Sequence, residues 1–331
     1  MNILVTGGTG YIGSHICLTL LKMNYTVIII DNLSNSNNDV ADKIKKISKN
    51  SNVYFYNIDM TKRLELEIPF LNHEIDGVIH CAGYKAVSES VEKPLIYYKN
   101  NVMSTIFLAE TLLKFKVNKL VFSSSATVYG NNTSPLKESM SLLPTINPYG
   151  ETKVMNERIL RDFSIANPQL SISFLRYFNP IGAHESGIIG ESPIGTPNNL
   201  MPYITQTAMG KLNYLSVYGN TYPTIDGTGV RDYIHVMDLA EGHIMSLEKL
   251  KKGIQIYNLG TGHGTSVLEL VHIFEKVNNV KVPYKFVSRR PGDLAVSYAD
   301  ASKIYKEIGW VTKRSVEDMC RDAWNYVKTN V

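Results

Sequence analysis

The chain has 331 residues, of which 44% are hydrophobic and 19% charged, and its formal net charge is +4. This balance is typical of a soluble globular protein, and the length suits one large domain or two joined domains. The basic residues form only short clusters at 43–46 and 249–252, which argues against a nucleic-acid-binding surface. No apolar stretch approaches the ~20 residues that a membrane span needs, and a strand pattern begins at Asn2. We therefore expect neither a membrane span nor a signal peptide.

The cysteines and histidines carry little chemistry of their own. Cys17, Cys81 and Cys320 are odd in number and far apart, which argues against a disulfide framework and favours a reducing, cytoplasmic location. The eight histidines show no spacing typical of metal ligands, so we predict no metal site.

Short apolar runs alternate with longer stretches of helical period along the first half of the chain. The expected buried strands are 3–5, 27–30, 53–56, 78–80, 120–122 and 172–175. The expected helices include 11–23, 102–115 and 149–165. This alternation predicts an α/β fold, a Rossmann-type doubly wound parallel sheet with helices on both faces.

The character of the chain changes near residue 180. Residues 181–200 are dense in Gly and Pro, and the alternating pattern returns at 254–259. We therefore expect a first domain over 1–180, to which part of 235–265 returns, and a smaller, interleaved lobe over 181–331.

A glycine-rich turn follows the first expected strand and opens the first helix. Gly8-x-Gly10-x-x-Gly13 fits the dinucleotide-binding fingerprint, and Gly7-x-x-Gly10-x-x-Gly13 fits its variant. Glycines permit the tight turn and the close approach of a pyrophosphate, which would lie at the N-terminus of the helix. The strand–turn–helix context makes this match stronger than a glycine pattern alone.

Two aspartates follow strands in the same region. Asp31 ends the second apolar run, near the distance of about 20 residues at which the fingerprint places an acid for the adenosine ribose. Asn32 and Leu33 come next, without an Arg for a 2′-phosphate, so we predict NAD rather than NADP. Asp59, after the third strand, contacts the adenine or is simply a turn residue; the sequence favours neither.

Tyr149 and Lys153 stand four residues apart, which places both side chains on one face of a helix. Asn147 is expected as the N-cap of this helix and Pro148 as its first residue. The ammonium and the helix N-terminus both favour a phenolate, which predicts a lowered pKa for Tyr149. Taken alone, Tyr-x-x-x-Lys is more often a helix-surface pattern. The serines at 123–125, which close the fifth strand where ligands of such sheets bind, make the combination specific.

In this order, the glycine-rich turn, the strand-end serines and the Tyr-x-x-x-Lys pair resemble the extended short-chain dehydrogenase/reductase family. The match covers nearly the whole chain and continues in blocks at 123–130, 147–150, 175–180, 197–203, 227–235 and 289–293. The later blocks lie in the substrate lobe and are similar to those of the family's UDP-hexose 4-epimerases. The resemblance implies reversible inversion at C4 of UDP-glucose and UDP-galactose through a 4-keto sugar, with tightly bound NAD⁺ regenerated in each cycle.

The resemblance also implies roles for individual residues. Tyr149 is the base, Lys153 lowers its pKa and holds the nicotinamide ribose, and Ser125 bonds the sugar 4-hydroxyl. The implied cofactor-binding residues are Gly7, Gly10, Tyr11, Ile12, Gly13, Asp31, Asn32, Asn35, Ser36, Asp59, Met60, Ala82, Gly83, Lys85, Asn100, Ser123, Tyr149, Lys153, Tyr177 and Phe178. The implied substrate-binding residues are Ser125, Tyr149, Asn179, Asn199, Leu200, Ser216, Tyr218, Arg231, Tyr233, Arg290, Asp293 and Ser297. Taken singly, the two arginines are more often surface charges, and Phe178 suits the core equally well.

Two positions depart from the pattern of relatives. Cys81 stands where some relatives carry an aromatic residue beside the cofactor, and we interpret it as a buried strand cysteine rather than a nucleophile. Ser297 stands where strictly hexose-specific relatives carry Tyr, and relatives with a small residue also accept N-acetylated sugars. We therefore expect activity on UDP-GlcNAc and UDP-GalNAc as well.

Rival functions remain open on the same fold. The first rival is a nucleotide-sugar 4,6-dehydratase or decarboxylase. Those dehydratases carry an acid and a base after the strand-end hydroxyl, where this chain has Ala126 and Thr127, which cannot perform the elimination. A non-catalytic NAD-binding sensor typically lacks the Tyr or the Lys, and a plain alcohol dehydrogenase exchanges free NAD(H). By analogy with the family we expect UDP-hexose substrates and a homodimer, and we expect neither a nucleic acid nor a membrane as a partner. In such a homodimer, apolar residues of two helices would pair, unless they are core; these are Ile106, Leu112, Leu113, Met155 and Ile159.

Overall fold

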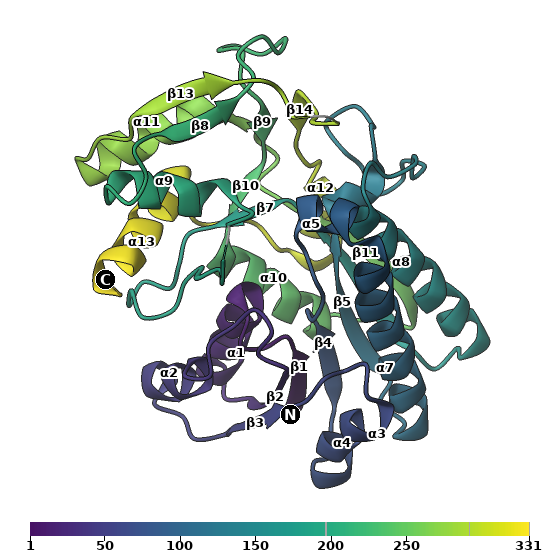
Figure 1. Ribbon diagram of the computed structural model, residues 1–331. Helices are drawn as coiled ribbons and strands as arrows, with labels where there is room; N and C mark the ends of the chain where they lie inside the picture. The colour runs from purple at the N-terminus through teal and green to yellow at the C-terminus, as the bar shows by residue number, and fades with distance from the viewer. Residues whose placement is uncertain (196, 291, 331) are drawn as a thin grey trace. The chain divides into compact units, whose positions relative to one another are not determined.

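The computed structural model describes all of the chain except residues 196, 291 and 331. The chain forms two compact units that interleave along the sequence (Figure 1). Unit 1 comprises Met1–Gly130, Leu142–Arg176 and Ala240–Tyr257, and unit 2 comprises Asn131–Ser141, Tyr177–Leu239 and Asn258–Val331.

Unit 1 is built on a seven-stranded sheet with the order β11-β6-β5-β4-β1-β2-β3. Its strands are β1 (Asn2–Thr6), β2 (Thr26–Asp31), β3 (Val53–Asn57), β4 (Gly77–His80), β5 (Lys119–Ser125), β6 (Ser171–Tyr177) and β11 (Gly253–Leu259). The ladders that join β3, β2, β1, β4 and β5 are parallel. The predicted Rossmann-type sheet is confirmed. Chain order reverses between β1 and β4, the switch point beyond which ligands bind in such sheets.

Helices lie on both sides of this sheet, with α1 and α2 on one side and α7 and α8 on the other (Figure 1). The helices of unit 1 are α1 (Tyr11–Lys22), α2 (Val40–Ser48), α3 (Arg63–Leu66), α4 (Ile68–Asn72), α5 (Val87–Glu92), α6 (Pro94–Tyr97), α7 (Met103–Lys114) and α8 (Pro148–Ala166). A π-helical turn (Tyr98–Val102) precedes α7, and a 3₁₀ turn (Ala126–Tyr129) follows β5. The strands read as continuous apolar runs because both faces of the sheet are covered. The core on the α7 and α8 side includes Leu4, Ile28, Val78, Leu120, Leu108, Leu112 and Leu160.

The start of α8 matters most for the site. Asn147 is its N-cap, and the Asn147 side chain accepts a hydrogen bond from the Gly150 backbone N–H at 2.8 Å. Pro148 occupies the first turn, where it needs no N–H partner. Both predictions are confirmed, and they place Tyr149 in the first turn.

The described residues of unit 2 form the small sheets β10-β7, β12-β9-β14 and β13-β8. Its strands are β7 (Asn179–Ile181), β8 (Leu215–Tyr218), β9 (Val230–Arg231), β10 (Tyr233–His235), β12 (Thr265–Ser266), β13 (Tyr284–Val287) and β14 (Val296–Ser297). Its helices are α9 (Leu200–Ala208), α11 (Val267–Asn278), α12 (Ser302–Ile308) and α13 (Val316–Thr329), while α10 (Val236–Glu248) runs from unit 2 into unit 1. Leu270, Phe274 and Trp324 are among the residues of a core that α9, α11 and α13 share.

Candidate active site

The glycine-rich turn between β1 and α1 is too tight for side chains at two positions. Gly7 has φ +67°, and a Cβ there would lie 2.8 Å from the Ala82 backbone nitrogen. A Cβ on Gly13 would lie 2.1 Å from the Gly7 carbonyl oxygen. Gly10 is the N-cap of α1 and offers no side chain to cap it. The first-turn N–H groups of α1 can therefore receive an anionic group such as a pyrophosphate.

Asp31, at the end of β2, is held against this turn. Its Oδ2 accepts from the Thr9 backbone N–H at 3.1 Å, and its Oδ1 accepts from the Leu33 N–H at 2.9 Å and the Ser36 hydroxyl at 3.3 Å. The Thr9 and Ser36 hydroxyls are 2.7 Å apart. The structure thus brings together the predicted phosphate turn and the predicted ribose acceptor. A carboxylate at this place favours ribose hydroxyls over a 2′-phosphate, so the turn and Asp31 together fit NAD.

Other predicted cofactor residues lie in unit 1, and they differ in their contacts and in their burial. The Lys85 Nζ lies 5.9 Å from the centroid of the Tyr11 ring, and Asn100, in the π-helical turn, donates to Asn101 at 3.1 Å. Asp59 accepts from the Thr61 N–H and hydroxyl, the arrangement of a turn aspartate. Met60 is part of the hydrophobic core of unit 1, and Ala82 is half-buried and packs against that core. The remaining predicted cofactor residues of unit 1 are half-buried or exposed; these are Ile12, Asn32, Asn35 and Gly83.

Ser125 and Tyr149 meet at the carboxyl end of β5. The Ser125 Oγ accepts from the Thr127 N–H at 3.2 Å and from the Thr127 hydroxyl at 3.0 Å. The Ser125 hydroxyl also interacts with the Tyr149 phenol, and this interaction lowers the pKa of Tyr149. Thr127 was not predicted as a site residue, although it stands in the block 123–130 that carried the resemblance.

The predicted fall in the pKa of Tyr149 is not found. Burial raises the pKa of Tyr149 to about 12, and the hydrogen bond from Ser125 lowers it only in part. The removal of the phenolate from water outweighs the other influences because only 8% of Tyr149 is exposed. Tyr149 is therefore a neutral phenol at pH 7 in this structure.

Lys153 is buried one turn further along α8. Its Nζ donates to the Ser123 carbonyl oxygen at 2.7 Å and lies 6.0 Å from the centroid of the Tyr149 ring. Burial lowers the pKa of Lys153 to about 8, while Cys81 and Glu157 oppose this shift. The ammonium is thus fixed beside the phenol but is only marginally protonated above neutrality.

This pKa predicts that kcat falls as pH rises through about 8. Lys153 is charged below that pH and neutral above it, so the cation beside Tyr149 is lost on the alkaline side. The measurement is kcat at saturating substrate across about pH 6–10. The Lys153→Met variant should have low activity without this alkaline limb. A wild-type kcat that stays constant to about pH 9 would contradict the assignment.

Ser123 connects this pair to the sheet. Its hydroxyl lies 3.1 Å from the Cys81 Sγ and 3.0 Å from the His243 Nε2. Cys81 is half-buried and directly follows β4, so the prediction of a buried strand cysteine is wrong. Burial raises the pKa of the Cys81 thiol to about 11, which fits the interpretation that it is not a nucleophile.

In unit 2, predicted substrate residues gather in two groups. Ser297 on β14 pairs with Arg231 on β9, and the Arg231 guanidinium forms an ion pair with Asp293. The Arg290 guanidinium lies 3.8 Å above the centroid of the Tyr218 ring. The first group offers a cation and two acceptors, and the second offers a cation over an aromatic face.

The other predicted residues of unit 2 lie on separate elements. Asn179 is exposed on β7, Ser216 is on β8, Tyr177 ends β6, and Phe178 is buried. Tyr233 on β10 is also buried, and burial raises its pKa. Asn199 and Leu200 stand at the start of α9.

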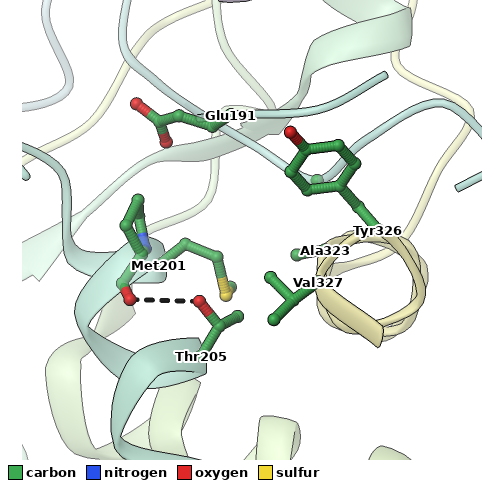
Figure 2. Close-up of a pocket in the computed structure, with 8 residues that line it drawn as sticks. Glu191, Met201, Thr205, Ala323, Tyr326 and Val327 are labelled. Carbon is green, nitrogen blue, oxygen red and sulfur yellow. Dashed lines mark hydrogen bonds between the residues drawn. The ribbon is translucent and has the colours of Figure 1, made fainter. Parts of the chain in front are cut away.

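Two carboxylates that were not predicted hold parts of unit 2 in place. Asp232, fully buried between the predicted residues Arg231 and Tyr233, accepts from the N–H groups of Thr261, Gly262 and Ala299. Glu191 accepts from the Asn199 amide at 2.5 Å. Figure 2 shows Glu191 at a small pocket between α9 and α13, opposite Tyr326 and Thr205. Sequence position alone pointed to Asp232, within the block 227–235, and gave no signal for Glu191.

In the described part of the chain, no group of three or more His, Cys, Asp or Glu side chains is arranged to hold a metal ion. Across the same residues, no helix has the length and apolar character of a membrane span.

Comparison with known proteins decides the family. Residues 3–260 match the NAD dependent epimerase/dehydratase family. The chain belongs to this family. It is 55% identical to the UDP-glucose 4-epimerase of Bacillus subtilis, over 100% of this chain and 98% of that protein.

Solved structures of the family agree with the fold. The UDP-glucose 4-epimerase of Bifidobacterium longum, solved with NAD⁺ and UDP, has a TM-score of 0.96 at 47% identity and covers 100% of this chain and 99% of its own. The UDP-Glc/GlcNAc 4-epimerase of Campylobacter jejuni has a TM-score of 0.85 at 35% identity and covers 99% of each chain. The glycine-rich turn and Asp31 thus stand within the part of the chain that matches an NAD-dependent family.

Proposed function

We propose that the protein is an NAD-dependent UDP-glucose 4-epimerase, which interconverts UDP-glucose and UDP-galactose through a 4-keto sugar. The observation that carries this proposal is the grouping of Ser125, Tyr149 and Lys153 at the carboxyl end of β5, in the same unit as the glycine-rich turn. Full-length similarity to named UDP-glucose 4-epimerases supports it. In this proposal unit 1 binds NAD and unit 2 binds the UDP-sugar.

The three side chains divide the proton chemistry at C4. In its phenolate form, Tyr149 accepts the proton of the sugar 4-hydroxyl and later returns it, while the Ser125 hydroxyl can bond the sugar oxygen. Lys153 supplies a fixed cation beside the phenol and can hold the ribose of the cofactor. When bound, NAD⁺ supplies the hydride acceptor and a positive ring whose charge favours the Tyr149 phenolate.

Unit 2 is proposed to hold the nucleotide while the sugar turns. Arg231 and Arg290 offer planar cations suited to the diphosphate, and Asp293 offers a carboxylate for the ribose hydroxyls. Tyr218, 39% exposed on β8, offers a ring face for the uracil. Inversion needs a firm hold on the diphosphate and a loose hold on the hexose, because both faces of C4 must reach the same hydride carrier.

The proposal is tested with protein purified without added cofactor. NAD⁺ released by denaturing the protein should approach one equivalent per chain, and UDP-galactose should be converted to UDP-glucose without a net gain of NADH. A plain dehydrogenase would need added NAD⁺ and accumulate NADH, and a non-catalytic sensor would leave the sugar unchanged. A dehydratase would produce a 4-keto-6-deoxy sugar. We do not expect this product, because Ala126 has no titratable group and the Thr127 hydroxyl is hydrogen-bonded to Ser125.

We further propose that N-acetylated sugars are substrates, because Ser297 is small and half-buried on β14, opposite Arg231. The Ser297→Tyr variant is expected to lose activity on UDP-GalNAc by at least about 100-fold while it keeps activity on UDP-galactose within about threefold. The added ring fills the space that an acetamido group would need. Assays of both substrates with both proteins check this, and equal effects on the two sugars would contradict it.

A homodimer and a cytosolic location complete the proposal. Leu95, Leu113 and Met155 are exposed apolar residues on α6, α7 and α8, and α8 contacts both α6 and α7. Leu112, in contrast, is buried in the core of unit 1. Light scattering should give about twice the chain mass of 37.1 kDa. The three cysteines are free thiols, which suits a reducing compartment, and cell fractionation would test that.

A further inference from the structure

A buried ion pair lies behind the catalytic end of β5, and the proposed chemistry does not use it. Glu157 of α8 and Arg176 of β6 each expose only 3% of their side chains. Two hydrogen bonds join them, at 2.9 Å from Nε to Oε1 and at 2.6 Å from Nη2 to Oε2. Because desolvation offsets much of the attraction in such pairs, apolar replacements are often as stable. Stability is therefore a weak reason for a pair at this place.

The pair is connected to the catalytic strand by a serine. The Ser124 hydroxyl donates to the Glu157 Oε1 at 2.6 Å. Successive side chains of a strand point to opposite faces, so Ser124 turns to Glu157 while Ser123 and Ser125 turn to the other side. Glu157 thereby joins β5, α8 and β6 at the point where the strand ends.

Arg176 extends this connection past Ser125. Its guanidinium carbon lies 4.9 Å from the centroid of the Tyr129 ring, which closes the 3₁₀ turn after β5. Cation–π contacts of this kind are stronger where water is excluded, and both side chains are buried. The segment that carries Ser125 is thus held on both sides, by Ser124 before it and by Tyr129 after it.

Glu157 also lies one helical turn after Lys153, where side chains share a face of α8. The titratable groups around Lys153 are Tyr149 and Glu157 on α8 and His80 and Cys81 at the end of β4. Arg176 on β6 is the ion-pair partner of Glu157. His80, Cys81 and Tyr149 are neutral near pH 7, because burial lowers the pKa of His80 to about 3 and raises those of Cys81 and Tyr149. Glu157 is therefore the carboxylate among the groups around Lys153, and it is paired with the Arg176 guanidinium.

We propose that Glu157 is a positioning residue for the reaction at Tyr149. Through Ser124 and Arg176 it holds the strand end that carries Ser123 and Ser125, and its negative charge stands one turn from the Lys153 ammonium. The kinetic part of this inference rests on the proposed epimerase activity.

The Ser124→Ala variant removes only the hydroxyl that joins β5 to Glu157. We expect kcat for UDP-galactose to fall about tenfold, with KM changed by less than about twofold, because the reacting groups lose alignment while substrate contacts remain. Ser173→Ala is the matched control, since Ser173 is a fully buried serine of β6 whose hydroxyl accepts from Ser246 at 2.7 Å. It should lose similar thermal stability and keep its kcat. An unchanged kcat in Ser124→Ala, or an equal loss in Ser173→Ala, overturns the positioning role.

The Glu157→Gln variant tests the charge without kinetics. In protein with ¹³C-labelled lysines, the Lys153 resonance is identified by its loss in Lys153→Met. In Glu157→Gln the Lys153 resonance should titrate at a lower pH than in the wild type, and in Ser124→Ala at the wild-type pH. If the Lys153 resonance titrates at the wild-type pH in Glu157→Gln, the proposed effect of the Glu157 charge is overturned. If Glu157→Gln does not fold, the kcat values of Ser124→Ala and Ser173→Ala decide the proposal. A wild-type protein without epimerase activity would refute the proposed function, and the Lys153 titration would still test the role of Glu157.

Discussion

In the Tyr149→Phe variant, kcat for UDP-galactose is expected to fall about 10³-fold, the range in which general acid–base residues contribute. The phenol is the group that interacts with Ser125 and that Lys153 faces at this end of β5. KM should change little, because the nucleotide is proposed to bind through unit 2. The measurement is steady-state kinetics together with the NAD content of the purified variant, which should equal that of the wild type.

Tyr97→Phe provides the matched control for this loss. Tyr97 is a buried tyrosine of unit 1 whose hydroxyl donates to Glu89 at 3.0 Å. The variant loses the same atom and one hydrogen bond, so its stability should fall by about 1 kcal/mol while kcat stays within about twofold. A Tyr149→Phe protein as active as Tyr97→Phe would show that the proton goes elsewhere.

The Gly13→Ala variant is expected to lose bound NAD and at least about 3 kcal/mol of unfolding free energy. Its new Cβ would lie 2.1 Å from the Gly7 carbonyl oxygen and 2.8 Å from the Gly8 Cα, both backbone atoms that cannot move without opening the turn. Opening the turn would displace the first-turn N–H groups of α1 from the pyrophosphate. Urea unfolding and the NAD content of the purified variant measure the two losses.

Gly10→Ala separates this clash from a general effect of alanine in the turn. Gly10 has φ −71°, which alanine adopts freely, and its nearest neighbour, the Gly7 carbonyl oxygen, would lie 3.3 Å from the new Cβ. Its unfolding free energy should fall by less than about 1 kcal/mol. Equal destabilisation of the two variants would be incompatible with the tight packing of Gly13.

Most of the sheet of unit 1 could be predicted because strands such as β1, β2 and β4 are buried on both faces and therefore read as apolar runs. The N-cap of α8 could be predicted because Asn147 and Pro148 act locally. Unit 2 was harder, since strands of two to four residues, such as β9 and β14, depend on distant partners. Asp232, for example, bonds residues near 261 and 299 that no local pattern connects to it.

In the candidate site, too, the features set by local sequence could be predicted and those set by tertiary packing could not. Helical spacing placed Tyr149 and Lys153 together, but spacing does not reveal how far a side chain is buried. The predicted shift in the pKa of Tyr149 therefore had the wrong sign, because burial of the phenol outweighs its interaction with Ser125. The pair of Glu157 and Arg176 was missed for a related reason: a carboxylate on a helix usually faces water, and only the packing of α8 against β5 and β6 encloses it.

The most direct test of the proposed reaction uses UDP-galactose that carries deuterium at C4, with protein to which no cofactor has been added. If the hydrogen leaves C4 as a hydride, stays on bound NAD and returns to the opposite face, the UDP-glucose formed keeps its deuterium at C4. Loss of that deuterium to solvent, or an oxidised sugar that accumulates together with NADH, would contradict the proposed reaction.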